Sequence, residues 1–223
     1  MTRMTNSRVA GFAFLFYIAV GITSMIVFGK AIAGENVAAR LTTMAQNAGA
    51  IHLNAILTLL EAFSALVLAV TLYALTREQD PDIAMLGMAC RVVEGVIGGT
   101  AVQSGLGMLW LATAPLAQAP NPVATQGIAA FLLWGQDSGT LSAIFFAVGS
   151  TLFSWLFLRG RMVPAFLAWL GLFASLLLVV ALPLQLAGVS VNGVIWAPAA
   201  LFEVSLALWL LIKGAAPAAR KNA

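Results

Sequence analysis

Charge is scarce in this sequence. Only 9% of its 223 residues are charged, whereas 61% are hydrophobic, and the mean hydropathy is +0.99. A soluble domain is about half apolar and about a quarter charged, so a soluble globular fold is excluded. The formal net charge of +3 does not indicate a nucleic-acid partner, because the basic residues lie at the ends of apolar runs and form no basic face. We therefore expect an integral membrane protein whose partner is the lipid bilayer.

Cysteine and histidine are almost absent. The chain has one cysteine, Cys90, and one histidine, His52, so a disulfide within the chain and a thiolate metal cluster are both excluded. His52 lies about one turn inside the outer end of an apolar run, where a polar interfacial residue is the simpler interpretation. No phosphate loop or dinucleotide fingerprint is present. The sequence thus predicts no metal and no cofactor, and it favours a protein that is not an enzyme.

Long apolar runs dominate the chain. A bilayer core of about 30 Å needs about 20 apolar residues in a helix. Runs of that kind predict six spans, near residues 9–29, 50–75, 83–113, 138–158, 163–187 and 195–212. The expected fold is an all-α, polytopic bundle of six transmembrane helices that forms a single integral membrane domain over residues 1–223.

Three connecting segments have patterns of their own. Residues 114–126 contain three prolines and are predicted to be an irregular outer loop. Residues 127–134 are apolar but too short to span, which favours an interfacial or re-entrant piece. Between the first two spans, Val37, Leu41 and Met44 fall at helical spacing and predict a short surface helix.

The basic residues predict the orientation. With a cytoplasmic N-terminus, eight of them fall on the inner side and two on the outer side. The inner set is Arg3, Arg8, Arg77, Arg159, Arg161, Lys213, Arg220 and Lys221, and the outer set is Lys30 and Arg40. This positive-inside bias predicts that both termini are cytoplasmic and that the number of spans is even.

Four ionisable residues fall at membrane depth: Glu61, Arg91, Glu94 and Glu203. Each costs about 2.5–3.5 kcal/mol near the centre of a membrane helix, so they are expected to face the protein interior. Their positions along their spans predict that all four converge near the midplane.

Helical spacing supports this convergence. Arg91 and Glu94 share a stripe with small residues, and Glu61 and Glu203 lie on polar or small-residue stripes of their own. The three stripes are Gly87, Arg91, Glu94, Gly98, Ala101 and Gly105; Asn54, Thr58, Glu61 and Ser64; and Ala199, Glu203 and Ala207. We therefore expect the second, third and sixth spans to pack around one polar centre. The small-residue stripes also suit a homodimer face.

The charge balance of this centre suggests a function. Three carboxylates and one guanidinium leave two excess negative charges, so some carboxyls are expected to be protonated, or a cation or small-molecule ligand joins them. The alternative is a helix clamp, in which Arg91 pairs with one or two glutamates and the remaining glutamates donate hydrogen bonds to the backbone or to Gln103. The residues expected to support the centre are His52, Asn54, Thr58, Gln103 and Asp137.

Three functions remain open on the residues alone. The first is a small transporter-like or ligand-binding protein, with one or more of the glutamates exchanging protons. The second is a membrane accessory or structural protein in which the cluster only clamps helices. The third is an intramembrane hydrolase that uses Ser138 with Asp137 and His52, although Asp137 or Ser138 is explained more simply as a helix N-cap.

Several short motifs resemble a bacterial family of multi-spanning membrane proteins, domain of unknown function 4386. They are Arg8-Val9-Ala10-Gly11, Leu72-Tyr73-Ala74-Leu75, Arg91-Val92-Val93-Glu94, Pro164 with Leu167 and Gly171, and Glu203 ahead of Leu208-Trp209-Leu210 and Lys213-Gly214. The resemblance covers most of the chain. It implies six spans in the bacterial inner membrane, and it implies no activity.

Overall fold

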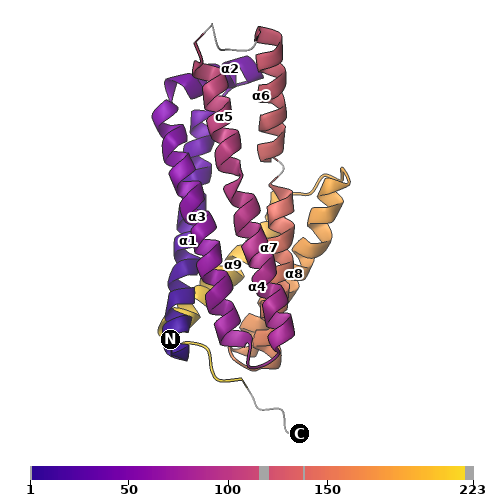
Figure 1. Cartoon of the computed structure of the whole chain (residues 1–223). Helices are drawn as coiled ribbons and strands as arrows, with labels where there is room; N and C mark the ends of the chain where they lie inside the picture. The colour runs from indigo at the N-terminus through magenta and orange to yellow at the C-terminus, as the bar shows by residue number, and fades with distance from the viewer. Residues whose placement is uncertain (1, 116–120, 138, 219–223) are drawn as a thin grey trace. The chain divides into compact units, whose positions relative to one another are not determined.

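The computed structural model describes residues 2–115, 121–137 and 139–218, without the side chains of Gln136 and Asp137. Within these residues the chain is helical and has no strand (Figure 1). The helices are α1 (Arg3–Ala31), α2 (Val37–Gln46), α3 (Ala48–Thr76), α4 (Pro81–Gly99), α5 (Ala101–Thr113), α6 (Pro122–Asp137), α7 (Thr140–Arg159), α8 (Ala165–Leu186), the 3₁₀ turn η1 (Gly193–Trp196) and α9 (Ala197–Ile212).

In the part of the chain that the structure describes, six helical segments are long and apolar enough to cross a bilayer. They are Arg3–Ala31, Ala48–Thr76, Pro81–Thr113, Pro122–Arg159, Ala165–Leu186 and Gly193–Ile212. The predicted all-α, six-span fold is thereby confirmed, and the chain is a multi-pass integral membrane protein. The cytoplasmic location of the termini stays a prediction.

The third predicted span is interrupted at Thr100, between α4 and α5. Two glycines, Gly98 and Gly99, precede the break, and glycine weakens a helix interior by about 1 kcal/mol. The Thr100 hydroxyl donates to the Ile97 carbonyl at 2.6 Å and so competes with the helical ladder. The interruption therefore has a local cause in the sequence.

The boundaries predicted around α6 were wrong. The predicted loop 114–126 ends at Asn121, and the short piece predicted at 127–134 belongs to a 16-residue helix. Asn121 caps this helix, since its side chain accepts a hydrogen bond from the Ala124 amide at 2.9 Å. Pro122 follows at the first helical position, where proline is well tolerated. This pair is a helix start, although the sequence interpretation counted it as loop.

The short surface helix predicted between the first two spans is confirmed as α2. Asn36 caps it by accepting a hydrogen bond from the Ala39 amide at 2.9 Å. Met44 is buried in a core cluster that also contains Ile51 and Met108. The helix therefore has one apolar side that packs inward.

By its internal contacts the chain divides into two compact units. Helices α1, α3 and α4 each contribute residues to both units. The first unit comprises residues 1–17, 63–95 and 140–223, and the second comprises residues 18–62 and 96–139. In the first unit α7 and α8 lie side by side, and α8 also packs against α9 (Figure 1). In the second unit α2 packs against α5 and α6.

Close helix approach in the first unit depends on glycine. A Cβ atom at Gly11 of α1 would lie 2.6 Å from the Ala207 carbonyl oxygen and 2.9 Å from the Leu211 nitrogen of α9. The backbones of α1 and α9 are thus in direct contact. At Gly87 of α4 the neighbour is the ring of Phe153, 3.1 Å from where a Cβ would stand. Small residues therefore admit an aromatic ring at one position and a backbone at another.

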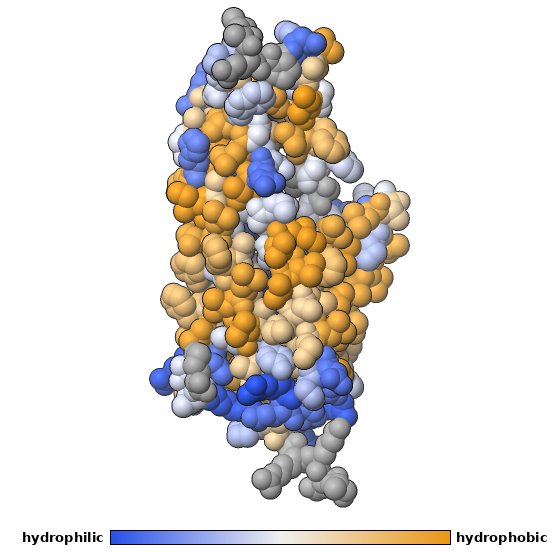
Figure 2. Space-filling model, viewed as in Figure 1, coloured by the Kyte–Doolittle hydropathy of each residue, from blue (hydrophilic) through white to orange (hydrophobic). Residues whose placement is uncertain are grey.

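Hydrophilic side chains gather at one end of the first unit, below a broad apolar surface (Figure 2). Arg3 pairs with Glu78 at 2.6 Å, and Arg159 lies 3.6 Å from Asp80. The second Arg3 nitrogen, Nη1, donates to the carbonyls of Leu75 and of a residue in the C-terminal segment, each at 3.0 Å. The chain start and the turn after α3 are thus bonded to one another at the same end of this unit.

Candidate functional site

Arg91 of α4 is the largest fully buried side chain among the described residues, with 1% of its surface exposed. Its stem packs against α7 at Gly149, where a Cβ would stand 3.3 Å from the arginine Cγ and Cδ atoms. Its guanidinium lies over two aromatic rings, 5.6 Å from the centroid of Tyr17 and 5.0 Å from that of Phe146. Such cation–π contacts stabilise a cation that has left water.

Glu94 lies one turn further along α4, at the i,i+3 spacing that brings two side chains together. Its Oε2 atom is 2.9 Å from Arg91 Nη1, and this ion pair is almost wholly buried. The Tyr17 hydroxyl donates to its Oε1 atom at 2.9 Å. The Ser142 hydroxyl of α7 donates to its backbone carbonyl at 3.0 Å. Glu94 thus joins α1, α4 and α7.

Glu203 of α9 completes a cluster with these two residues. It is 7% exposed and lies close enough to Arg91 and Glu94 to interact electrostatically with both. Its Oε1 atom is buried and has no hydrogen-bond partner among the described residues. We call Arg91, Glu94 and Glu203 the buried charge centre.

Several polar atoms of this centre lack hydrogen bonds. In the described part of the chain, Arg91 Nε and Nη2 are buried without a partner, and the Nη1–Oε2 ion pair with Glu94 lacks hydrogen-bond geometry. Leaving a buried polar group unsatisfied costs about 1–3 kcal/mol, and more if it is charged. The centre therefore retains strong hydrogen-bonding capacity that its own side chains do not use.

Glu61, the fourth predicted site residue, is half-buried in the second unit. A Cβ at Gly21 of α1 would stand 3.0 Å from its Oε1 atom, so its carboxyl group packs against the α1 backbone. Its predicted convergence with Arg91 stays a prediction.

The predicted supporting residues differ in their surroundings. Asn54 accepts a hydrogen bond from Ser24 at 2.7 Å, and Thr58 donates to the Asn54 carbonyl at 2.9 Å. His52 and Gln103 are exposed on their helices. The side chain of Asp137 and the whole of Ser138 lie outside the described residues, so the predicted cap and the hydrolase alternative are untested.

Sequence reasoning missed the residues of other helices that contact Arg91 or Glu94. Tyr17, Phe146 and Ser142 come from two other helices and were not predicted as site residues. Tyr17 carried a usable signal, because it is one of only two tyrosines and its hydroxyl falls within an apolar run. Phe146 carried none, since it is one of 13 phenylalanines.

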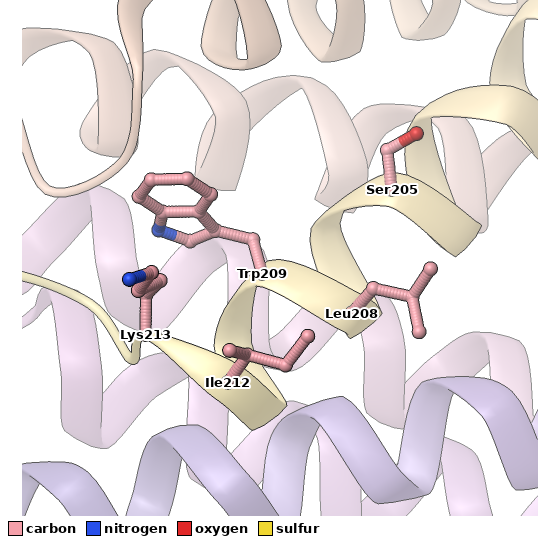
Figure 3. Close-up of a pocket in the computed structure, with 5 residues that line it drawn as sticks. All are labelled: Ser205, Leu208, Trp209, Ile212 and Lys213. Carbon is pink, nitrogen blue, oxygen red and sulfur yellow. The ribbon is translucent and has the colours of Figure 1, made fainter.

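A surface hollow on α9 is separate from the buried charge centre. It has a volume of about 350 Å³ and is lined by Ser205, Leu208, Trp209, Ile212 and Lys213 (Figure 3). Ile212 lies nine residues after Glu203, about two and a half helical turns, and so on the opposite side of α9. A hollow of about 500 Å³ in the second unit, between α2, α5 and α6, contains none of the predicted site residues. Among the described residues no three His, Cys, Asp or Glu side chains group to hold a metal ion.

Comparison with models of protein families identifies the family of this chain. The model of the family described as Domain of unknown function (DUF4386) matches residues 9–214. The chain belongs to the DUF4386 family. No curated protein and no solved structure matches it.

In this DUF4386 protein the motifs that suggested the family also build the buried charge centre. Arg91-Val92-Val93-Glu94 supplies the ion pair, and Gly11 supplies the contact between α1 and α9. A Cβ at Gly171 of α8 would overlap the ring of Phe202 and stand 2.6 Å from Ser154 Oγ. The motifs of this DUF4386 member thus hold together the helices that carry the buried charges.

Proposed function

We propose that this protein is a small, proton-linked transporter-like protein of the bacterial inner membrane, with both termini in the cytoplasm. The buried charge centre binds the ligand. Glu203 takes up a proton when the ligand binds and releases it when the ligand leaves. The observation that carries the proposal is a guanidinium with 1% exposure whose Nε and Nη2 atoms have no partner, next to a Glu203 oxygen that also has none.

Glu203 is the residue that favours ligand binding over a purely structural role. A clamp stabilises a fold by satisfying its own charges, because an uncompensated buried charge is strongly destabilising. Glu94 fits that description, since its Oε1 atom accepts a hydrogen bond from Tyr17 and its charge is compensated by the ion pair of its Oε2 atom with Arg91. Glu203 Oε1 does not, since no described group bonds to it. Ionisable groups that stay unsatisfied inside a membrane protein are typical of ion and substrate pathways.

The second candidate is a membrane accessory protein in which the centre is only a clamp. The bonds of Glu94 favour it, because they join three helices through one side chain. Under this alternative every substitution in the centre acts on stability and none acts on a bound ligand.

A paired experiment separates the two candidates. The purified full chain, Glu203→Gln and Glu35→Gln are reconstituted into vesicles that enclose a pH-sensitive dye. A panel of carboxylates, amines, amino acids and sugars is then added outside. Glu35 is an exposed residue between α1 and α2, so its substitution is a matched loss of one carboxylate outside the centre.

The transporter proposal expects at least one panel member to change the internal pH with the native chain and Glu35→Gln, but not with Glu203→Gln. Melting temperatures in detergent are measured in parallel, and Glu203→Gln is expected to stay folded. If no panel member moves protons and Glu203→Gln only lowers the melting temperature, the clamp is the correct function.

A further inference from the structure

We infer that the ligand of the buried charge centre is a small carboxylate, held by the free edge of the Arg91 guanidinium. The inference rests on the proposed function and adds the chemical class of the ligand and the number of protons bound with it.

The first step is the geometry of the guanidinium. Its Nη1 atom faces Glu94, which leaves Nε and Nη2 without partners among the described residues. These two nitrogens lie on the same edge of the planar group and direct parallel N–H bonds outward. A carboxylate accepts two such bonds side by side, and this bidentate pairing is the strongest hydrogen bonding that arginine makes.

The second step is the selection of charge. The unsatisfied groups at Arg91 are donors on a cation, so a cationic ligand at that edge would be repelled and could accept nothing. A neutral ligand with one acceptor would satisfy only one of the two nitrogens. The rings of Tyr17 and Phe146 hold the guanidinium in place, so its edge is pre-organised for binding.

The third step is the charge balance. Arg91 carries one positive charge, whereas Glu94 and Glu203 carry one negative charge each when ionised. The other titratable groups of the cluster are Cys90, which interacts electrostatically with Glu94, and Tyr17. A bound carboxylate adds one negative charge, and a proton taken up by Glu203 cancels it. The centre then keeps the same net charge, which avoids the cost of burying a second unpaired anion.

The test is calorimetric titration of the full chain in detergent. The carboxylates are acetate, propionate and benzoate, and the uncharged analogues of the same shape are their amides. Each titration is repeated in two buffers of different ionisation enthalpy, which gives the number of protons taken up per ligand. Arg91→Lys keeps the charge but loses the planar edge, and Glu203→Gln keeps the shape but cannot ionise.

The inference expects at least one carboxylate to bind with uptake of about one proton, and the matching amide to bind at least about tenfold more weakly. Arg91→Lys should weaken that binding by about tenfold or more. Glu203→Gln should still bind the carboxylate but without proton uptake, and Glu35→Gln should behave as the native chain. If Arg91→Lys does not fold, the loss of proton uptake in Glu203→Gln remains decisive.

Three results would overturn the inference. They are equal binding of amides and carboxylates, unchanged proton uptake in Glu203→Gln, and no binding of any carboxylate by the native chain. Proton-linked movement of an amine or sugar that requires Glu203, without carboxylate binding, leaves the proposed function standing and removes only the ligand class. Failure of every compound in both assays removes both.

Discussion

At the scale of single residues, Glu94 and Glu203 are both buried in the same centre but differ in the partners of their oxygens. Glu94 sits at i,i+3 from Arg91 and has a partner for each oxygen. Glu203 comes from another helix and keeps one buried oxygen without a partner. Each of the two has one buried oxygen without a hydrogen bond, so the difference lies in charge pairing: Glu94 Oε2 forms an ion pair with Arg91, whereas Glu203 forms no salt bridge among the described residues.

Tyr17→Phe tests the structural side of this contrast. The change removes the hydroxyl that donates to Glu94 Oε1 and keeps the ring that faces Arg91. We expect a loss of about 1–3 kcal/mol in unfolding free energy, because a buried carboxylate oxygen is left without its donor. The melting temperature of the full chain in detergent measures it.

Tyr73→Phe is the matched control for Tyr17→Phe. Tyr73 packs at the edge of the core of the first unit, and its hydroxyl makes no hydrogen bond with the described residues. We expect the melting temperature of the Tyr73→Phe variant to stay near that of the native chain. Equal effects of the two substitutions would show that the bond to Glu94 contributes nothing.

At the scale of helices, glycine decides which surfaces meet. Gly11 admits the backbone of α9, and Gly171 admits both the Phe202 ring and Ser154. These contacts hold α1, α7, α8 and α9 around the buried charge centre. The hydrophobic effect does not draw helices together within lipid, so such close packing has to supply the association.

Gly11→Ala is expected to be strongly destabilising. The new methyl group would stand 2.6 Å from a backbone oxygen of α9, and a backbone cannot move aside as a flexible side chain can. We expect a loss of about 1–3 kcal/mol or misfolding, measured as the melting temperature and the folded yield in detergent.

Gly29→Ala in the same helix provides the control. Apart from its own stretch of helix, no described residue has an atom within 4 Å of a Cβ at Gly29, so the methyl group meets no neighbour there. Alanine favours a helix over glycine by about 1 kcal/mol, and this variant should be as stable as the native chain or slightly more so. A similar loss in both variants would show that close packing against α9 does not explain the effect at Gly11, because helix propensity alone favours alanine at both positions.

Much of the fold could be predicted from the sequence because spans follow from length and hydropathy. The break at Thr100 could have been read from Gly98 and Gly99, and the start of α6 from Asn121-Pro122, but both signals are local and a window of about 19 residues averages them out. The Arg91–Glu94 pair was predictable because both residues lie on one helix. Tyr17 could have been singled out as a polar group in an apolar run, but its bond to Glu94 could not have been predicted, since that bond depends on how separate helices approach.

At the scale of the whole molecule, apolar side chains cover the surface that a bilayer would contact. Phe12, Phe63 and Phe166 are each more than 60% exposed, which is costly in water and favourable in lipid. Basic residues collect where the chain start and the turns after α3 and α7 lie in the first unit. These are segments for which the positive-inside rule predicts one common side of the membrane.

Cysteine labelling in intact cells tests that orientation. The native chain is an unlabelled control, because its only thiol, Cys90, is 7% exposed within a helix. Three single substitutions, Glu35→Cys, Gln79→Cys and Ser190→Cys, place a thiol between α1 and α2, between α3 and α4, and after α8. A membrane-impermeant maleimide should label the first and third in intact cells, and the second only after lysis.

The labelling pattern has a clear physical basis. An even number of spans puts both ends of the chain on one side, and each connection then alternates in position, with basic residues retained in the cytoplasm. Labelling of Gln79→Cys in intact cells together with protection of Glu35→Cys would reverse the orientation. In a six-span fold the chain crosses the membrane an even number of times between residues 35 and 190. If Glu35→Cys and Ser190→Cys differ in accessibility, the chain crosses an odd number of times between them. The most direct place for such a change is Pro122–Arg159, where α6 and α7 together are longer than one crossing needs.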